Sequence, residues 1–178
     1  MADDNEVTLT IDGKLVTAPK GSVVVDAAKS IGIEIPVFCY HEKLGPFGCC
    51  RMCLVEVEKM PKLTTACTLQ VAPDMVVKTD TPQVEKAQKG VLEFTLLNHP
   101  LDCPVCDKGG ECPLQNNTFK YGPGDTRMEF ERANRDKATP LSPVITIDRE
   151  RCIACQRCTR YSDIIEQESA LVMLNRGF

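Results

Sequence analysis

The sequence is poor in aromatic residues and in long apolar runs. Its 178 residues include no tryptophan, three tyrosines and six phenylalanines. No apolar run approaches the ~18–20 residues that a membrane-spanning helix needs. Lys and Arg total 21 against 25 Asp and Glu, for a formal net charge of −4, so we expect neither a membrane span nor a nucleic-acid-binding surface.

Other signals are missing as well. The acidic N-terminal residues 1–13 have no apolar core and no Arg- and Ser-rich amphipathic pattern, so we expect neither a secretory signal nor a transit peptide. No glycine-rich nucleotide-binding loop and no Ser-His-Asp arrangement can be identified, and His41 beside Tyr40 is expected to be structural. The sequence therefore predicts no catalytic residue.

Cysteine is abundant, at 11 residues. A disulfide framework belongs to oxidising compartments and to chains with an export signal, and here the cysteine count is odd. Metal ligation by thiolates is the better explanation, and zinc must be separated from iron–sulfur clusters by the spacing of the cysteines.

The first segment predicts an α+β fold. Asp12-Gly13 between two β-rich runs indicates a hairpin, Ser22 is expected to cap a helix that Gly32 ends, and Thr81 with Pro82 is expected to begin another helix. This is the β-grasp pattern of plant-type ferredoxins, by analogy of fold. The predicted strands are Val7–Ile11, Lys14–Ala18, Cys53–Lys59, Thr65–Leu69 and Met75–Thr79, and the predicted helices are Ser22–Ile33 and Thr81–Asn98.

Four cysteines in this segment, Cys39, Cys50, Cys53 and Cys67, have the spacing C-x10-C-x2-C-x13-C. A 2Fe–2S cluster takes four thiolates, two per iron, whereas zinc ribbons use two C-x2-C pairs and only one is present. The spacing favours 2Fe–2S, with zinc or structural thiols as alternatives. Chain neighbours seldom both reach one cluster, so Cys49 is expected to be a small buried residue.

A second set consists of a histidine followed by three cysteines at intervals of four, three and six residues: His99, Cys103, Cys106 and Cys112. Prolines and glycines are expected to interrupt any helix here and to leave backbone N–H groups free to face cluster sulfurs. They are Pro100, Pro104, Gly109, Gly110 and Pro113. A zinc site with the same four ligands and a 4Fe–4S cubane with one imidazole ligand both fit the residue types.

A third set follows the polar linker Glu131–Pro143 and a predicted strand at Val144–Ile147. Cys152, Cys155 and Cys158 form the C-x2-C-x2-C run of bacterial ferredoxins, which indicates a 4Fe–4S cluster. Ser162 and Asp163 stand where the local fourth cysteine would be expected, and no later cysteine follows. The alternatives are a non-cysteine ligand, a three-iron form, or a chain that stops before its fourth thiolate, which is the simplest.

Three runs carry a family resemblance: CYHEKLGPFGCCRMCLVEVEK, LLNHPLDCPVCDKGGECPLQ and LSPVITIDRERCIACQRCTRY. They resemble the N-terminal part of the large iron–sulfur subunit of bacterial respiratory complex I, the G subunit of NADH–quinone oxidoreductase. The resemblance implies a 2Fe–2S cluster on the first set, a 4Fe–4S cluster on the second and a second 4Fe–4S cluster on the third. In this family the last cluster's fourth cysteine lies well downstream, as does a long molybdopterin-enzyme-like region.

The resemblance further implies a 2Fe–2S domain over residues 1–97, a histidine-and-cysteine 4Fe–4S domain over 98–137, and a partial 4Fe–4S ferredoxin-like domain over 138–178. It implies a peripheral position on the cytoplasmic side of the bacterial membrane, beside an FMN- and NADH-binding subunit. The implied activity is transfer of NADH-derived electrons toward quinone. The alternatives are an electron-input subunit of an NAD-linked hydrogenase or formate dehydrogenase, and a zinc-binding interaction module.

Overall fold

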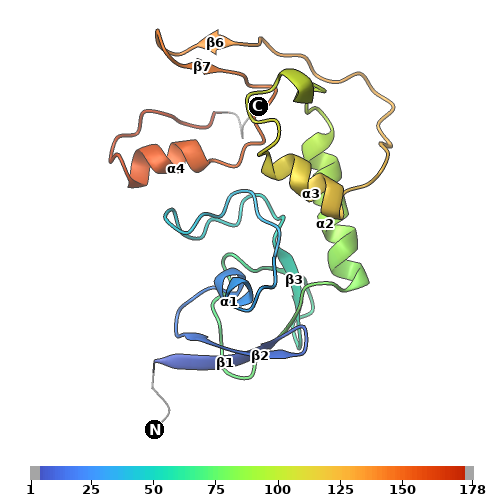
Figure 1. Ribbon diagram of the computed structural model, residues 1–178, viewed down its shortest axis with the longest axis vertical. Coiled ribbons are helices and arrows are strands. Elements are labelled where there is room, and N and C mark those ends of the chain that lie inside the picture. Colours follow the sequence, from blue (N-terminus) through green and yellow to red (C-terminus); the bar gives the residue numbers. More distant parts are fainter. Residues whose placement is uncertain (1–4, 175–178) are drawn as a thin grey trace.

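The computed structural model describes residues 5–174, and a mixed five-stranded sheet forms its N-terminal part (Figure 1). The strand order is β2-β1-β5-β3-β4; β1 runs antiparallel to β2 and parallel to β5, while β3 is antiparallel to β5 and β4. This sheet, with helix α1 against it, confirms the expected β-grasp fold. The strands are β1 (Glu6–Ile11), β2 (Lys14–Pro19), β3 (Leu54–Val57), β4 (Thr64–Thr65) and β5 (Val76–Lys78).

The turn between β1 and β2 confirms the predicted hairpin. Asp12 (φ 47°) and Gly13 (φ 77°) both have positive φ, as a two-residue type I′ turn requires. The Asp12 carboxylate also accepts hydrogen bonds from the Thr79 backbone N–H at 2.7 Å and from its hydroxyl at 2.6 Å. The hairpin is therefore fastened to the end of β5.

Helix α1 (Val24–Ser30) has Val23 and not Ser22 as its N-cap, so it starts one residue later than predicted. The Ser22 hydroxyl donates to the Pro19 carbonyl instead of capping the helix. The first helical N–H groups are satisfied by tertiary contacts, because Val24 donates to the Leu69 carbonyl at 2.9 Å and Val25 to that of Ala66 at 3.1 Å. Carbonyl groups distant in the sequence therefore satisfy the N–H groups that a side-chain cap would otherwise satisfy. The local sequence does not reveal such contacts.

These contacts also correct the predicted strand at Thr65–Leu69. Strand β4 ends at Thr65, and Cys67 lies in the turn that follows. The Thr68 N–H donates back to the Thr65 carbonyl at 3.1 Å, closing the turn. Cys67 is therefore held at the N-terminal end of α1 and is fully buried.

Helix α2 (Pro82–Leu96) begins as predicted. The Thr81 hydroxyl accepts a hydrogen bond from the Val84 N–H at 3.3 Å, and proline occupies the first helical position. The buried face includes Gln88, which is only 2% exposed and donates to the Leu54 carbonyl at 3.5 Å. A polar side chain on this face fits because it meets a backbone acceptor on β3.

The C-terminal part contains short elements that the sequence indicated poorly. Pro113 begins a helix rather than interrupting one, because a first helical position needs no N–H donor. The strand expected at Val144–Ile147 is reduced to two residues. The elements are the 3₁₀ turn η1 (Cys103–Val105), α3 (Pro113–Tyr121), β6 (Thr139–Pro140), β7 (Thr146–Ile147) and α4 (Arg157–Ile164).

Two apolar clusters hold these parts together. The larger fills the space between the sheet and α1. The smaller, called the Met52 cluster below, has buried Phe38, Met52, Leu92 and Leu114 at its centre. It lies where α2, α3 and the loop before β3 meet, and Ile153 and Cys155, which precede α4, pack against it. None of the helices within residues 5–174 is both long and apolar enough to cross a bilayer.

Candidate metal centres

The first predicted set lies in the loop before β3 and in the turn after β4. Cys39, Cys53 and Cys67 are at most 1% exposed, and Cys50 is half-buried. The Cys39 N–H points at the Cys50 sulfur, at 3.5 Å. The loop reaches this shape through left-handed residues, among them Arg51 at φ 58°.

The four thiols of the first set influence one another's ionisation. Hydrogen bonding with Cys50 and Cys67 lowers the pKa of the Cys39 thiol, and the same contacts raise the pKa values of Cys50 and Cys67. Hydrogen bonding with Cys67 likewise lowers the pKa of Cys53. The contact of the Cys39 N–H with the Cys50 sulfur and these mutual effects on pKa place the four thiols near one another, so the structure brings this predicted set together. Burial and the neighbouring Cys39 also raise the pKa of Cys49.

The expectation that Cys49 is buried is wrong, because its side chain is exposed. Cys49 precedes a bend at Cys50, and of the two side chains only that of Cys50 is half-buried. The Cys49 thiol donates to the carbonyl of Cys155 at 4.0 Å. Cys49 therefore lies where the first segment meets the third.

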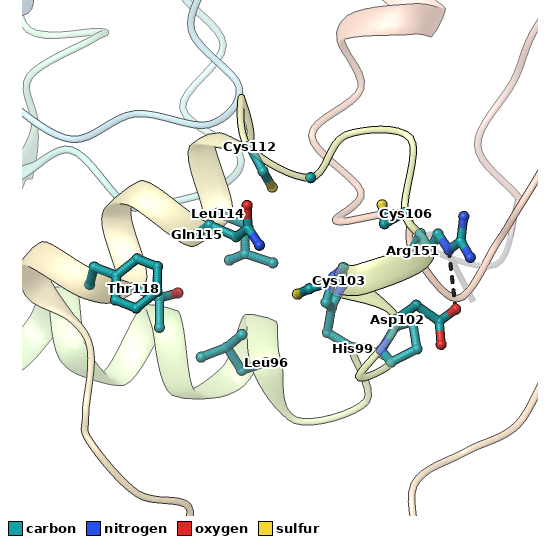
Figure 2. Close-up of a pocket in the computed structure, with 13 residues that line it drawn as sticks. Leu96, His99, Asp102, Cys103, Cys106, Cys112, Leu114, Gln115, Thr118 and Arg151 are labelled. Atoms are coloured by element: carbon teal, nitrogen blue, oxygen red, sulfur yellow. Dashed lines mark hydrogen bonds and ion pairs between the residues drawn. The ribbon is translucent and has the colours of Figure 1, made fainter.

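The second predicted set lines a single cavity of about 190 Å³ between α2, η1 and α3 (Figure 2). All four residues, His99, Cys103, Cys106 and Cys112, border it. The Cys112 and Cys103 sulfurs point toward its interior, and Leu96 and Leu114 supply apolar wall (Figure 2). The structure therefore brings this set together around one space.

Three local features place the second set. His99 follows the end of α2, and its N–H donates to the Leu96 carbonyl at 3.2 Å. Cys103 begins η1, and the Cys106 N–H closes that turn on the Cys103 carbonyl at 3.4 Å. Cys112 is the N-cap of α3, where the positive end of the helix dipole favours a negatively charged thiolate.

The charge around His99 suits a metal-ligating imidazole. Burial lowers the pKa of His99, and Arg132 and Arg151 act in the same direction while Asp102 opposes them. The ring is therefore neutral near pH 7 and can offer a nitrogen lone pair. Asp102 itself is paired with Lys137 at 2.5 Å and with Arg151 at 3.1 Å.

Two further residues on the cavity wall bear on what the cavity can hold. The Thr118 hydroxyl is fully buried and has no hydrogen-bond partner within the described residues. A cluster sulfur would provide the acceptor that this hydroxyl lacks. Gly109 fits closely, since a Cβ there would lie 2.9 Å from the Cys103 carbonyl oxygen and 3.1 Å from that of Cys106. The sequence singled out Gly109, but no local signal marks Thr118.

The third set is more open. Cys152 and Cys158 are exposed and Cys155 is half-buried. Ala154 (φ 52°) and Gln156 (φ 57°) bend the backbone between them. The Ala154 N–H donates to the Cys152 sulfur at 3.4 Å, but no hydrogen bond joins two of the three sulfurs in the part of the chain that the structure describes. The structure therefore places this set on one bent loop without connecting its sulfurs directly.

The donor types suit iron–sulfur clusters in all three places. Across residues 5–174, no group of three or more His, Cys, Asp or Glu side chains has the geometry to hold a single metal ion. Sulfide-bridged clusters distribute their ligands over several irons. Four connected thiols fit a two-iron cluster, and a cavity bordered by three thiols, one neutral imidazole and an unpartnered hydroxyl fits a four-iron cluster.

Comparison with known families agrees with these donor sets. A 2Fe–2S iron–sulfur cluster binding domain matches residues 4–82. The NADH-ubiquinone oxidoreductase-G iron–sulfur binding region matches residues 88–127, and the ferredoxin-like domain of NADH-quinone oxidoreductase subunit 3 matches residues 142–178. The fold and sites thus define an iron–sulfur protein with a 2Fe–2S domain followed by 4Fe–4S binding regions. The chain belongs to the family of the NADH-quinone oxidoreductase G subunit.

Relatives that match almost the whole of this chain support the family assignment. The chain is 50% identical over 173 residues to the NADH-quinone oxidoreductase G subunit of Streptomyces coelicolor, covering 96% of this chain and 20% of that protein. It is 49% identical over 176 residues to the mitochondrial NADH-ubiquinone oxidoreductase 78 kDa subunit of Neurospora crassa, covering 97% of this chain and 23% of that protein. The chain therefore spans only about a fifth to a quarter of these relatives.

Among solved structures, the chain resembles one from a NAD⁺-reducing [NiFe]-hydrogenase in the H₂-reduced state. The TM-score is 0.85 at 29% sequence identity, covering 95% of this chain and 70% of that chain. The hydrogenase chain therefore shares this arrangement of elements.

Proposed function

We propose that the chain is the iron–sulfur electron-transfer segment of an NADH–quinone oxidoreductase, carrying NADH-derived electrons from an FMN group on a neighbouring subunit toward quinone. The identity of about half the residues with the G subunit of that enzyme supports this over the hydrogenase alternative, for which identity is 29%. The chain serves the enzyme by conducting electrons, and we assign it no catalytic residue.

The proposed ligands are those that the sequence indicated. Cys39, Cys50, Cys53 and Cys67 hold the 2Fe–2S cluster; His99, Cys103, Cys106 and Cys112 hold one 4Fe–4S cluster; and Cys152, Cys155 and Cys158 supply three ligands to another. The corresponding domains are residues 1–97, 98–137 and 138–178. When bound, these clusters supply one-electron oxidation and reduction.

The observation that carries this proposal is the make-up of the Met52 cluster. One cysteine from each set, Cys50, Cys112 and Cys155, packs against its buried centre. Each set therefore reaches the same apolar cluster through one of its cysteines. Such an environment excludes water, which protects reduced metal centres and influences their potentials.

The chain's own residues have distinct parts in this function. The thiolates fix each cluster in place, and the neutral His99 imidazole contributes one less negative charge than a thiolate would. The ion pairs of Asp102 with Arg151 and of Lys137 with Glu150 join the second region to the third. The Arg151 side chain also borders the cavity of the second set, so the relative position of these two regions is held by charge.

The proposed partners are other subunits of the peripheral arm, including the FMN- and NADH-binding subunit. The proposed location is the cytoplasmic face of the bacterial membrane, without insertion into it. The names of the relatives, which are subunits of an oxidoreductase, support a multi-subunit assembly.

The decisive experiment is metal and sulfide analysis of anaerobically purified chain, combined with EPR spectroscopy of the dithionite-reduced sample. We expect a brown protein with acid-labile sulfide, about ten irons per chain if all three sets are filled, and separate two-iron and four-iron signals. A colourless protein that contains zinc and no sulfide would establish the zinc-binding alternative.

A second experiment separates the two electron-transfer assignments. In membranes of the cell that makes this chain, replacing Cys50 with alanine should abolish NADH-dependent quinone reduction. If the substitution abolishes hydrogen-dependent NAD⁺ reduction instead of quinone reduction, the hydrogenase alternative is favoured.

A further inference from the structure

Helix α4 presents a buried arginine to the loop of the first cysteine set, and the two lie side by side in Figure 1. Arg160 is 7% exposed. Its guanidinium donates to the carbonyl of Cys39 at 3.1 Å, to that of Gly45 at 2.9 Å, and to that of Leu44. These bonds join a segment of the third region to the backbone of a proposed 2Fe–2S ligand more than a hundred residues away.

A second arginine of α4 reaches the same loop. Arg157 donates to the Tyr40 carbonyl at 2.5 Å, next to Cys39 in the chain. Its Nε atom is buried and has no hydrogen-bond partner in the described residues. Two positive charges therefore converge on the backbone of residues 39–45.

Neither arginine forms an ion pair with a carboxylate anywhere in residues 5–174. Carbonyl oxygens satisfy the hydrogen bonds of a guanidinium but carry no net charge. A buried cation is costly unless an anion compensates it. Glu42, within the loop, is already paired with Lys29, and Asp26 accepts a hydrogen bond from the Tyr40 hydroxyl. The bond of Arg160 to the Cys39 carbonyl brings its charge to the group of four thiols that includes Cys39, while Arg157 also lies in the sequence between Cys155 and Cys158 of the third set.

We propose that Arg157 and Arg160 are the counter-charges of the 2Fe–2S site and raise its reduction potential. This inference rests on the proposed function, because it requires the cluster to be present. Two ferric irons, two sulfides and four thiolates sum to two negative charges, and reduction adds a third. A nearby cation stabilises the more negative reduced form more strongly, so the potential rises.

The surroundings of Arg160 strengthen this effect. The Phe47 ring lies 4.6 Å from the guanidinium carbon and covers one face of it. An arginine cannot lose its proton at physiological pH, and its planar donors are fixed by three carbonyls. The charge is therefore permanent, poorly hydrated and held in one place, in contrast to that of a surface lysine.

The test is an EPR-monitored redox titration of the 2Fe–2S signal in the full 178-residue chain, prepared anaerobically. In Arg160→Gln, the ratio of reduced to oxidised cluster at a fixed potential should fall about tenfold, which is a shift of ~59 mV for one electron. Arg157→Gln should shift the potential in the same direction. Arg160→Lys, which keeps the charge, should shift it less than Arg160→Gln.

Arg127→Gln is the matched control, because Arg127 is 82% exposed and already paired with Glu93. The reduction potential of the 2Fe–2S cluster in Arg127→Gln should equal that in the unmodified chain. An intact 2Fe–2S signal with unchanged potential in Arg160→Gln and Arg157→Gln would overturn the inference. If Arg160→Gln does not assemble the cluster, the potential of Arg157→Gln decides alone. Absence of any 2Fe–2S signal in the unmodified chain would instead contradict the proposed function.

Discussion

At the scale of single residues, two adjacent cysteines have contrasting environments. Cys50 is half-buried and shares hydrogen bonding with Cys39, whereas Cys49 is exposed and contacts the Cys155 carbonyl. The sequence identified Cys50 as the ligand through its C-x2-C spacing with Cys53. It could not show the contact of Cys49 with Cys155, because the two residues lie more than a hundred positions apart in the sequence.

This contrast gives the first prediction. Cys50→Ala removes a ligand from the first set and should eliminate the 2Fe–2S EPR signal while the four-iron signals persist. Cys49→Ala should retain all signals, because the Cys49 side chain is exposed and the C-x2-C pair is formed by Cys50 and Cys53. EPR spin quantitation in both variants is the measurement, and loss of the 2Fe–2S signal in Cys49→Ala would show that the ligands were assigned wrongly.

The same scale separates residues that sequence can reveal from those it cannot. The cysteines and His99 are visible because metal ligation demands particular residue types at short spacings. Thr118, Arg157 and Arg160 carry no such signal, since threonines and arginines are common and their roles arise from tertiary packing. Their burial or lack of partners identifies them only in the folded chain.

At the scale of elements, prediction succeeded where local chemistry determines the backbone. The Asp12-Gly13 turn, the Thr81 cap and the strand at β3 all follow from residues within a few positions. It failed where tertiary contacts decide, as at the N-terminus of α1, which is satisfied by carbonyls of the turn that carries Cys67. Pro113 was wrongly expected to interrupt a helix, because proline is unfavourable in a helix interior but common at the first helical position.

The loop from His99 to Cys112 gives a prediction at this scale. A methyl group at position 109 would collide with the carbonyl oxygens of Cys103 and Cys106, both of which are backbone atoms in the ligand turn. Gly109→Ala should therefore displace those two ligands and lower the iron content by about four atoms per chain. Iron analysis and the intensity of the four-iron EPR signals would measure the loss.

Gly124→Ala is the control for that substitution, because a Cβ at Gly124 meets nothing within 4 Å. It should keep the full iron content. Equal iron content in Gly109→Ala and Gly124→Ala would mean that the turn can shift without releasing its ligands.

At the scale of the whole molecule, one cysteine of each set packs against the same small apolar cluster. The β-grasp sheet has its own core, but α2, α3 and the third segment meet the first segment around Met52. Spacing along the sequence divides the chain into three consecutive regions. It gives no indication that one cysteine of each region packs against the same buried cluster, because such packing is a property of the tertiary fold.

The last prediction concerns Met52, which is fully buried and lies in the sequence between two proposed 2Fe–2S ligands, Cys50 and Cys53. Met52→Ala leaves a cavity where the three regions meet and should cost ~2–5 kcal/mol of stability. At about 2–4 °C per kcal/mol for a chain of this size, thermal unfolding of the cluster-loaded chain should begin clearly earlier. Met52→Leu, which conserves volume, should cost less than ~1.5 kcal/mol, and Met60→Ala, at an exposed position, should change little.

If the Met52 cluster shields all three sites, Met52→Ala should also make both the two-iron and the four-iron EPR signals decay faster in air. Faster decay of one class of signal alone would show that the sites are protected independently of one another.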